Sequence, residues 1–265
     1  YEPRKFYLLH LRADGRPAAI TTLPITEPAG AEVTGLALSP DGTKLAMAIM
    51  PDDNKPDLTE LKLFSVPTGK VLRTWQANGV IGFSVSGDDP ETLSWTSDQH
   101  TLAFLWEAIG NGPQQGEWLL DLSKSGTSLI GDSRQAMSLG NTSSGRSPKG
   151  QSCQQDLIIT PDGSAVACGA VVLAGLVQNP RIATSAYLEY SSASGTVTRT
   201  LARWTLPNAG TLALDVLWSN PSGSVLIGEI PTTGNGAVGM ITAGTFTPLP
   251  GLGSPGIDVV DQGTW

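Results

Sequence analysis

The apolar and polar positions along this chain repeat a short hairpin pattern. Residues 36–38 form an apolar run, Ser39-Pro40-Asp41-Gly42 follows as a turn, and residues 45–49 are apolar again. In such a turn proline presets φ, aspartate accepts nearby backbone N–H groups, and glycine tolerates positive φ. Both flanking runs are nearly all apolar, which predicts strands buried on both faces. Related segments recur about sixty residues apart at 95–106, 159–170 and 218–229.

A second kind of hairpin alternates with the first. Segments 6–24, 61–75, 118–131, 187–201 and 238–250 alternate apolar and polar residues around a glycine-containing turn, which is typical of half-exposed strands. Two buried and two half-exposed strands make one four-stranded sheet, and repetition of such sheets about an axis makes a β-propeller. We therefore predict an all-β propeller with four complete blades at about 33–75, 92–130, 155–201 and 212–250. A β-sandwich built from the same hairpins is the alternative.

The two ends of the chain leave the number of blades open. The hairpin at 6–24 supplies only outer strands, and the segment GIDVVDQGTW at 256–265 can supply one inner, closing strand. If the two ends share a blade, residues 1–265 form one domain with five blades, whereas missing upstream residues would allow six or seven. The chain begins at Tyr1 without methionine or a signal-like segment, so we expect a processed or trimmed part of a longer protein.

Composition narrows the fold and the classes of partner. The 265 residues are 40% hydrophobic, which suits one large all-β domain with a sizeable core. Only 15% are charged, while 31 glycines and 19 prolines disfavour a helical bundle. The net charge of −8 disfavours nucleic-acid binding, which needs a basic surface. No run of eighteen apolar residues is present, so we expect no membrane span.

Four segments carry a resemblance to a known group of proteins: FYLLHLRADGRPA, LALSPDGTKLAMA, LSWTSDQHTLAFLW and VLWSNPSGSVLIGE. With SPDG at 39–42 and TPDG at 160–163, the chain resembles bacterial WD-repeat-like and Tol-type propellers, and more closely a group of uncharacterised actinobacterial propeller proteins. Those proteins usually carry an N-terminal membrane anchor and an outward-facing propeller. The resemblance therefore implies an extracytoplasmic protein, secreted or at the cell surface and released from an anchored precursor. It implies no catalytic residues, and this chain lacks the anchor and the first strands.

Two cysteines, Cys153 and Cys168, flank the turn at 160–163. In a hairpin centred there they lie nearly opposite each other, and a small register offset would bring them to bridging distance. Such a disulfide would close about 15 residues and contribute roughly 3 kcal/mol in the chain-entropy model. It would also indicate an oxidising compartment. Two buried, inert thiols are the alternative.

Candidate binding residues lie in two long loops and at one strand end. The acidic loop at 51–60 offers oxygen ligands that suit calcium, although a hydrated loop is the alternative reading. The Gly/Ser-rich stretch at 131–152 is predicted to be a long flexible excursion, either an adaptable binding loop or a solvated linker. Trp106 ends a returning strand and is expected to line a loop-built surface. The candidates are Asp52, Asp53, Asp57, Trp106, Arg134, Arg146 and Lys149.

Catalytic chemistry is weakly represented in the sequence. His10 and His100 are the only histidines, and no Gly-x-Ser-x-Gly segment is present. We predict no catalytic residues and no metal site. Asp41, Asp98 and Asp162 recur at the hairpin turns, so we interpret them as structural acids. Trp95 and Trp218 occupy equivalent inner-strand positions and are expected in the core between blades.

These observations predict a non-enzymatic, extracytoplasmic scaffold without a cofactor. It would bind a partner protein, or further copies of itself, through its blade loops. Strands missing at the N-terminus would leave an unpaired edge able to accept a strand from another chain. The alternative is a propeller enzyme of the lactonase or lyase type with a metal in the central channel. The scarcity of histidine argues against that alternative.

Overall fold

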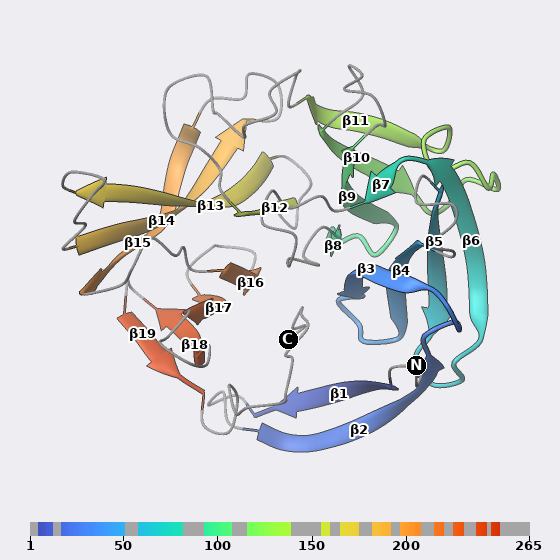
Figure 1. The fold of residues 1–265 in the computed structure, drawn as a ribbon, viewed down its shortest axis with the longest axis horizontal. Coiled ribbons are helices and arrows are strands. Elements are labelled where there is room, and N and C mark those ends of the chain that lie inside the picture. The colour runs from blue at the N-terminus through green and yellow to red at the C-terminus, as the bar shows by residue number, and fades with distance from the viewer. Residues whose placement is uncertain are drawn as a thin grey trace. The chain divides into compact units, whose positions relative to one another are not determined.

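The computed structural model of the chain describes residues 5–12, 17–50, 58–81, 93–107, 116–138, 155–159, 165–174, 182–191, 197–207, 215–219, 225–230, 237–242 and 245–249. Within these ranges every regular element is a β-strand (Figure 1). The chain forms two compact units, one of residues Tyr1–Asn141 with Val260–Trp265 and one of Thr142–Val259. Across the described residues we find no helix long and apolar enough to cross a membrane.

The first four-stranded sheet of the first unit follows the expected blade pattern. Ser39, Asp41 and Gly42 shape the turn between its first two strands, and Gly42 adopts a φ of +69° that favours glycine. Residues 45–49 are all buried, whereas the fourth strand is largely exposed. The strands are β3 (Glu32–Leu38), β4 (Lys44–Met50), β5 (Leu58–Ser65) and β6 (Val71–Asn78), paired antiparallel in chain order.

The second sheet has a divided inner strand. Its strands are β7 (Val80–Ile81), β8 (Leu93–Trp95), β9 (Thr101–Glu107), β10 (Gly116–Asp121) and β11 (Ser133–Ser138). Both β7 and β8 pair with β9, which pairs on with β10 and then β11. The two short strands together therefore occupy the place that β3 holds in the first sheet.

Two expectations for this sheet are wrong. The fourth strand was expected within 118–131, and residues 131–152 were expected as a flexible excursion, but β11 lies at 133–138. An edge strand pairs through its backbone on one side only and needs little apolar burial. The polar sequence SRQAMS can therefore form this strand. The residues between β10 and β11 instead reach the neighbouring sheet.

That connection, residues 122–132, attaches to the outer strand β6. The Gln76 N–H donates to the Thr127 carbonyl, and the Leu129 N–H donates to the Gln76 carbonyl, both at 3.0 Å. The Arg73 guanidinium donates to the Leu122 carbonyl at 3.1 Å and also to the Gly126 carbonyl. We call residues 122–132 with Arg73 the latch, because they join the outer edges of the two sheets.

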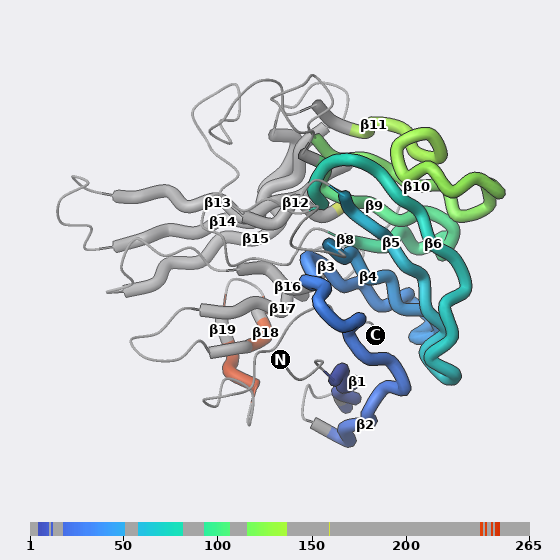
Figure 2. Tube along the Cα trace, turned by 45° about the vertical axis from the view of Figure 1, so that its right-hand side comes forward, coloured from blue at the N-terminus to red at the C-terminus, as the bar shows by residue number. Residues whose placement is uncertain are grey.

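The inner parts of the two sheets share one core. Trp95 of β8 donates from its indole Nε1 to the Ala37 carbonyl of β3 at 3.0 Å, so the two strands lie side by side (Figure 2). Phe104 and Trp106 meet edge to face with ring centroids 6.3 Å apart. The expectation that Trp95 belongs to the core between blades is confirmed, while the Trp218 side chain lies outside the described residues.

The N-terminal hairpin packs on the other face of the first sheet. It consists of β1 (Lys5–Leu11) and β2 (Pro17–Thr26). Leu23 and Ile25 are buried against Met47 and Ile49 of β4, and Phe6 and Leu8 pack on the same cluster. One face of the hairpin is thus part of a hydrophobic core.

The second unit repeats the four-stranded arrangement. One sheet contains β12 (Gln155–Ile159), β13 (Ala165–Ala174), β14 (Ile182–Ser191) and β15 (Val197–Pro207). The other contains β16 (Asp215–Ser219), β17 (Val225–Ile230), β18 (Ala237–Thr242) and β19 (Thr245–Pro248). The expected fold class, an all-β propeller of four-stranded blades, is confirmed. The number of blades, the single-domain boundaries and the closing strand at 256–265 stay predictions.

Candidate interaction surface

The N-terminal hairpin presents an apolar face to solvent. Its register places Tyr7 opposite Thr22 and Leu9 opposite Ile20, so these four side chains share one face. That face is opposite to the one that Leu8 turns toward the core. Tyr7 is 60% exposed and Ile20 is 69% exposed. We call Tyr7, Leu9 and Ile20 the hairpin face.

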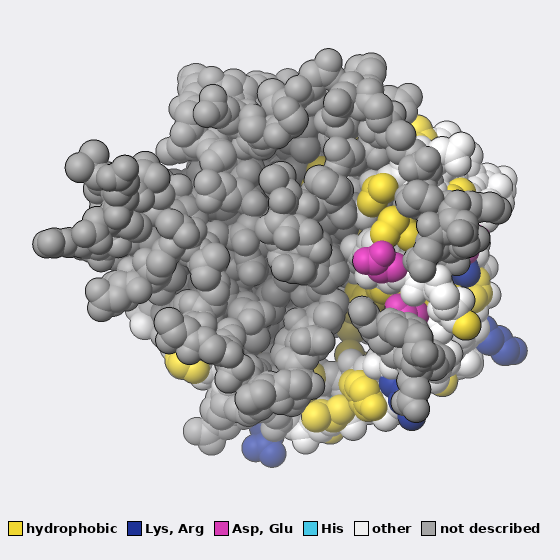
Figure 3. Space-filling model, in the orientation of Figure 1, with side chains coloured by type: hydrophobic (Ala, Val, Ile, Leu, Met, Phe, Trp, Pro, Cys, Tyr) yellow, Lys and Arg dark blue, Asp and Glu magenta, His cyan; other side chains and the backbone are white. Residues whose placement is uncertain are grey.

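The hairpin also has fewer strands than the other sheets. Among the strands that the structure describes, β1 pairs only with β2, whereas three other sheets have four strands each. A two-stranded sheet is marginally stable by itself and presents unpaired backbone groups at its edges. Figure 3 shows apolar side chains at the surface in the region of β1 and β2. Among the described residues of the first unit, Tyr7 and Ile20 of this hairpin are the most exposed large apolar side chains.

A second exposed apolar pair lies at the start of β6. Val71 is 50% exposed and Leu72 is 53% exposed. Both belong to an outer strand whose later residues are held by the latch. This pair provides a useful comparison, because it matches the hairpin face in chemistry but lies on a complete four-stranded sheet.

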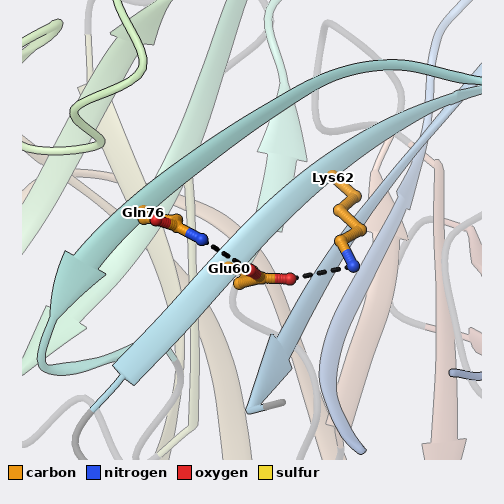
Figure 4. A network of polar contacts seen from close by, with 3 residues as sticks. All are labelled: Glu60, Lys62 and Gln76. Atoms are coloured by element: carbon orange, nitrogen blue, oxygen red, sulfur yellow. Dashed lines mark hydrogen bonds and ion pairs between the residues drawn. The ribbon is translucent and has the colours of Figure 1, made fainter. Parts of the chain in front are cut away.

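Glu60, the last residue of the acidic loop at 51–60, interacts with two side chains of the protein. Lys62 Nζ lies 2.8 Å from Glu60 Oε2, and Gln76 Nε2 donates to Glu60 Oε1 at 2.6 Å (Figure 4). Partial burial by itself raises the pKa of Glu60, but hydrogen bonds from Lys62 and Gln76 outweigh it and hold the pKa below its ordinary value. Glu60 therefore stabilises the pairing of β5 with β6. The other acids of the loop, Asp52, Asp53 and Asp57, lie outside the described residues.

The repeated turn aspartates are structural. Asp41 accepts hydrogen bonds from the Ser39 hydroxyl at 2.6 Å and from the Thr43 N–H at 3.0 Å. These bonds, that of Ser39 first, lower the pKa of Asp41 to about 2. Asp98 accepts an equivalent set in the next blade, including two backbone N–H groups. The interpretation of these two acids as structural is confirmed, and Asp162 lies outside the described residues.

The two histidines lie at separate exposed sites. His100 is in the turn before β9, where its backbone N–H donates to Asp98 at 2.8 Å. His10 is on β1 and its Nε2 lies 3.2 Å from Thr21 Oγ1. Within the described ranges, no three His, Cys, Asp or Glu side chains gather in a way that could hold a metal ion.

The prediction that Trp106 lines a loop-built surface is wrong. Its side chain is only 1% exposed and lies in the core that the two sheets share. Gly79 packs directly on the ring, with no room for a Cβ. The returning strand β9 is an inner strand of its sheet. Inner strands are covered on both faces, and here the burial extends to Trp106 near the end of the strand.

The remaining candidates from the sequence are only partly placed. Arg134 is exposed on β11, and a binding role for it stays a prediction. Cys168 lies on β13 with its backbone opposite Leu188, but its side chain lies outside the described residues. The disulfide with Cys153 therefore stays a prediction. Outside the described residues lie Arg146, Lys149 and Cys153.

Sequence reasoning missed two features of the first unit. The alternation of β1 was read as an ordinary outer strand, although the paired tyrosine, leucine and isoleucine were present in the sequence. Glu117 was not singled out either, although it stands within the short run Gly-Glu-Trp-Leu-Leu. Its side chain is fully buried, and both carboxyl oxygens are without a hydrogen-bond partner.

No protein-family model and no curated protein matches the chain. Among solved structures, the chain is similar to the Cps50 (Swd1) β-propeller domain of Myceliophteria thermophila, with a TM-score of 0.44 and 10% identity over 94% of this chain and 84% of that one. It is also similar to a prolyl endopeptidase, with a TM-score of 0.43 and 12% identity over 88% and 38% of the two chains. The acylaminoacyl peptidase of Pyrococcus horikoshii has a TM-score of 0.40 and 7% identity over 83% and 32%.

These comparisons correct one expectation. The prediction that the chain is not an enzyme does not stand, because several of the structures it is similar to are peptidases. At such low identity the likeness bears on the fold alone. The chain spans about a third of the length of the first peptidases it matches.

Proposed function

We propose that this chain is a propeller scaffold that binds a partner protein, and that its N-terminal hairpin is the docking surface. The proposal rests on one observation, which is that Tyr7 and Ile20 are 60% and 69% exposed on a sheet whose other face is core. Burying one large apolar side chain contributes about 1.5–3 kcal/mol. The hairpin face therefore offers a substantial part of the free energy that a specific complex needs.

The hairpin also supports a particular mode of binding. Among the described strands, none pairs with the outer edge of β1, so this edge can offer backbone donors and acceptors to an added strand while alternate side chains contact the hairpin face. Among the described residues of this hairpin, the exposed charged side chains are basic, Lys5 at the start of β1 and Arg12 just after it. We accordingly propose a partner with an extended segment of alternating apolar residues, flanked by acidic side chains.

A cross-linking experiment followed by affinity measurement tests this proposal. A photoreactive amino acid at position 20 should yield one cross-linked partner from the source cells, whereas the same group at His100 should not. With the purified partner, Ile20→Ser and Tyr7→Ser should each weaken binding at least about tenfold. The matched control Leu72→Ser removes an apolar side chain of similar exposure, 53%, from β6 and should leave affinity unchanged.

Two results would contradict the proposal. Equal affinity of the Tyr7 and Ile20 variants and the unmodified chain would exclude the hairpin face. A cross-linked product of twice the chain mass would exclude a separate partner and assign the surface to self-association, which a sedimentation experiment would then verify.

We further propose that the protein acts outside the cytoplasm and belongs with the Tol-type, actinobacterial propellers that its hairpin segments resemble. What supports the compartment is the spacing of Cys153 and Cys168 about a single hairpin turn. Reaction of the unreduced, unfolded protein with a thiol reagent is expected to detect no free thiol. Detection of two free thiols would contradict an oxidised protein.

A further inference from the structure

Glu117 is the second residue of β10 and is fully buried. Both of its carboxyl oxygens are without a hydrogen-bond partner, and it belongs to no ion pair in the part of the chain that is described. A buried carboxylate without a partner is among the most costly groups in a protein interior, so the neutral acid is the form that fits this place.

Among the described residues of β9, β10 and β11, no cation stands opposite Glu117. Directly opposite stand Leu105 on β9 and Met137 on β11, both uncharged. On the same face of the sheet, Arg134 is opposite Leu119 and is itself exposed. The other titratable residues on this face are Asp121 and Asp132 at the far end of the strands and Glu107 on β9, whose side chain lies outside the described residues.

The pairing of β10 with β11 changes register directly after Glu117. Gly116 pairs with Ser138 and Glu117 pairs with Met137, but the register then shifts, and Trp118 pairs with Gln135. Gly116 has a φ of +144°, which favours glycine. A register shift is a place where pairing can end without disturbing the strand beyond it. Residues 116–117 can therefore separate from β11 while 118–121 remain paired.

We propose that residues 116–117 form a pH-operated clasp between β10 and β11. While Glu117 is neutral, its side chain stays buried, its backbone stays paired with Met137, and the clasp is closed. When Glu117 loses its proton to water, the carboxylate leaves the interior, and the pairs of Gly116 and Glu117 with β11 open. The clasp responds to acidity alone and does not depend on the proposed docking role of the hairpin.

The direction of the response follows from proton linkage. Burial raises the pKa of Glu117 well above its ordinary value of 4.5 in the closed form, whereas in the open form the carboxyl is in water. Protonation of Glu117 therefore stabilises the closed form fully when the pH is below the ordinary pKa of 4.5. This stabilisation is lost as the pH rises toward the raised pKa of the closed form. Between the two values, opening releases one proton, so the opening constant rises about tenfold per pH unit.

Hydrogen exchange resolved along β10 and β11 measures this opening. As pH rises above about 5, the amides of 116–117 and 137–138 should open more often in the unmodified chain, by about tenfold per pH unit until the raised pKa of Glu117 is reached, after correction for intrinsic exchange. Glu117→Gln keeps the shape of the neutral acid and should abolish this rise. Asp121→Asn removes the partly exposed acid at the end of the same strand and should preserve the rise. When a variant and the unmodified chain are compared at the same pH, the intrinsic exchange rate cancels from their ratio.

Three outcomes would overturn the clasp. The first is an equal pH dependence in Glu117→Gln and in the unmodified chain. The second is simultaneous opening of 118–121, which would indicate loss of the whole strand rather than of its first pairs. The third is an ordinary pKa for Glu117 in a carbon-13 titration of the unmodified chain, and this measurement does not require any variant to fold.

Discussion

The latch between the two sheets of the first unit gives the sharpest prediction for stability. Arg73 donates from its guanidinium to the carbonyls of Leu122 and Gly126, and the same group lies 4.6 Å from the centre of the Trp75 ring. Arg73→Ala removes all three contacts at once. Because the latch attaches one sheet to the next, we expect this substitution to lower the free energy of unfolding of the first unit.

The expected loss can be worked out from these contacts. A hydrogen bond from a charged donor contributes about 1.5–3 kcal/mol, which falls to about 1 kcal/mol for a half-buried group that water can reach. The contact with Trp75 adds about 0.5–1 kcal/mol. We expect Arg73→Ala to cost about 2–3 kcal/mol. Arg73→Lys keeps the charge but not the planar fork and should cost about half as much.

Urea unfolding followed by circular dichroism measures the loss as a shift of the midpoint at constant slope. Arg134→Ala provides the matched control, because Arg134 is an exposed arginine on β11 and its removal should change stability by less than about 0.5 kcal/mol. A loss for Arg73→Ala no larger than that of the control would refute the latch as a stabilising contact between the sheets.

The remaining predictions concern a tight contact, a turn and the cysteines. Gly79→Ala would place a Cβ 2.2 Å from an indole ring and should cost about 3 kcal/mol or more, whereas Gly42→Ala, also at positive φ but in open space, should cost about 1 kcal/mol. The contribution of Asp41, whose pKa is lowered to about 2, should be present above pH 3.8 and be lost as pH falls toward 2, so Asp41→Asn should flatten the acid limb of thermal unfolding. Finally, reduction of native protein should add the mass of two hydrogens if Cys153 and Cys168 are bridged, and an unchanged mass would contradict the bridge.

The blades were predictable because their local signals agree with their tertiary role. The turn at 39–42 contains proline, aspartate and glycine in the order that the turn requires, and the runs beside it are apolar on both faces. The same agreement placed Trp95 in the core between sheets. Where strand propensity, hydrophobic pattern and burial agree, a single sequence is sufficient to predict the strands and turns.

Edges and strand ends were harder to predict. The strand β11 has a polar sequence, because an outer strand needs little apolar burial, and so its sequence looks like a loop. Trp106 looked like a surface anchor, because nothing in the sequence reveals which layer of the blade a strand end occupies. The exposure of Ile20 could not be derived either, since it depends on which strands pair with the hairpin.

Covalent footprinting tests the proposed docking surface most directly. Side chains would be labelled with a short-lived radical reagent in the source cells and, separately, in the purified chain. The account predicts that Tyr7 and Ile20 are labelled strongly in the purified chain and are protected in the cells, while Leu72 is labelled equally in both. Equal labelling of Tyr7 and Ile20 in both settings would contradict a partner on the hairpin face.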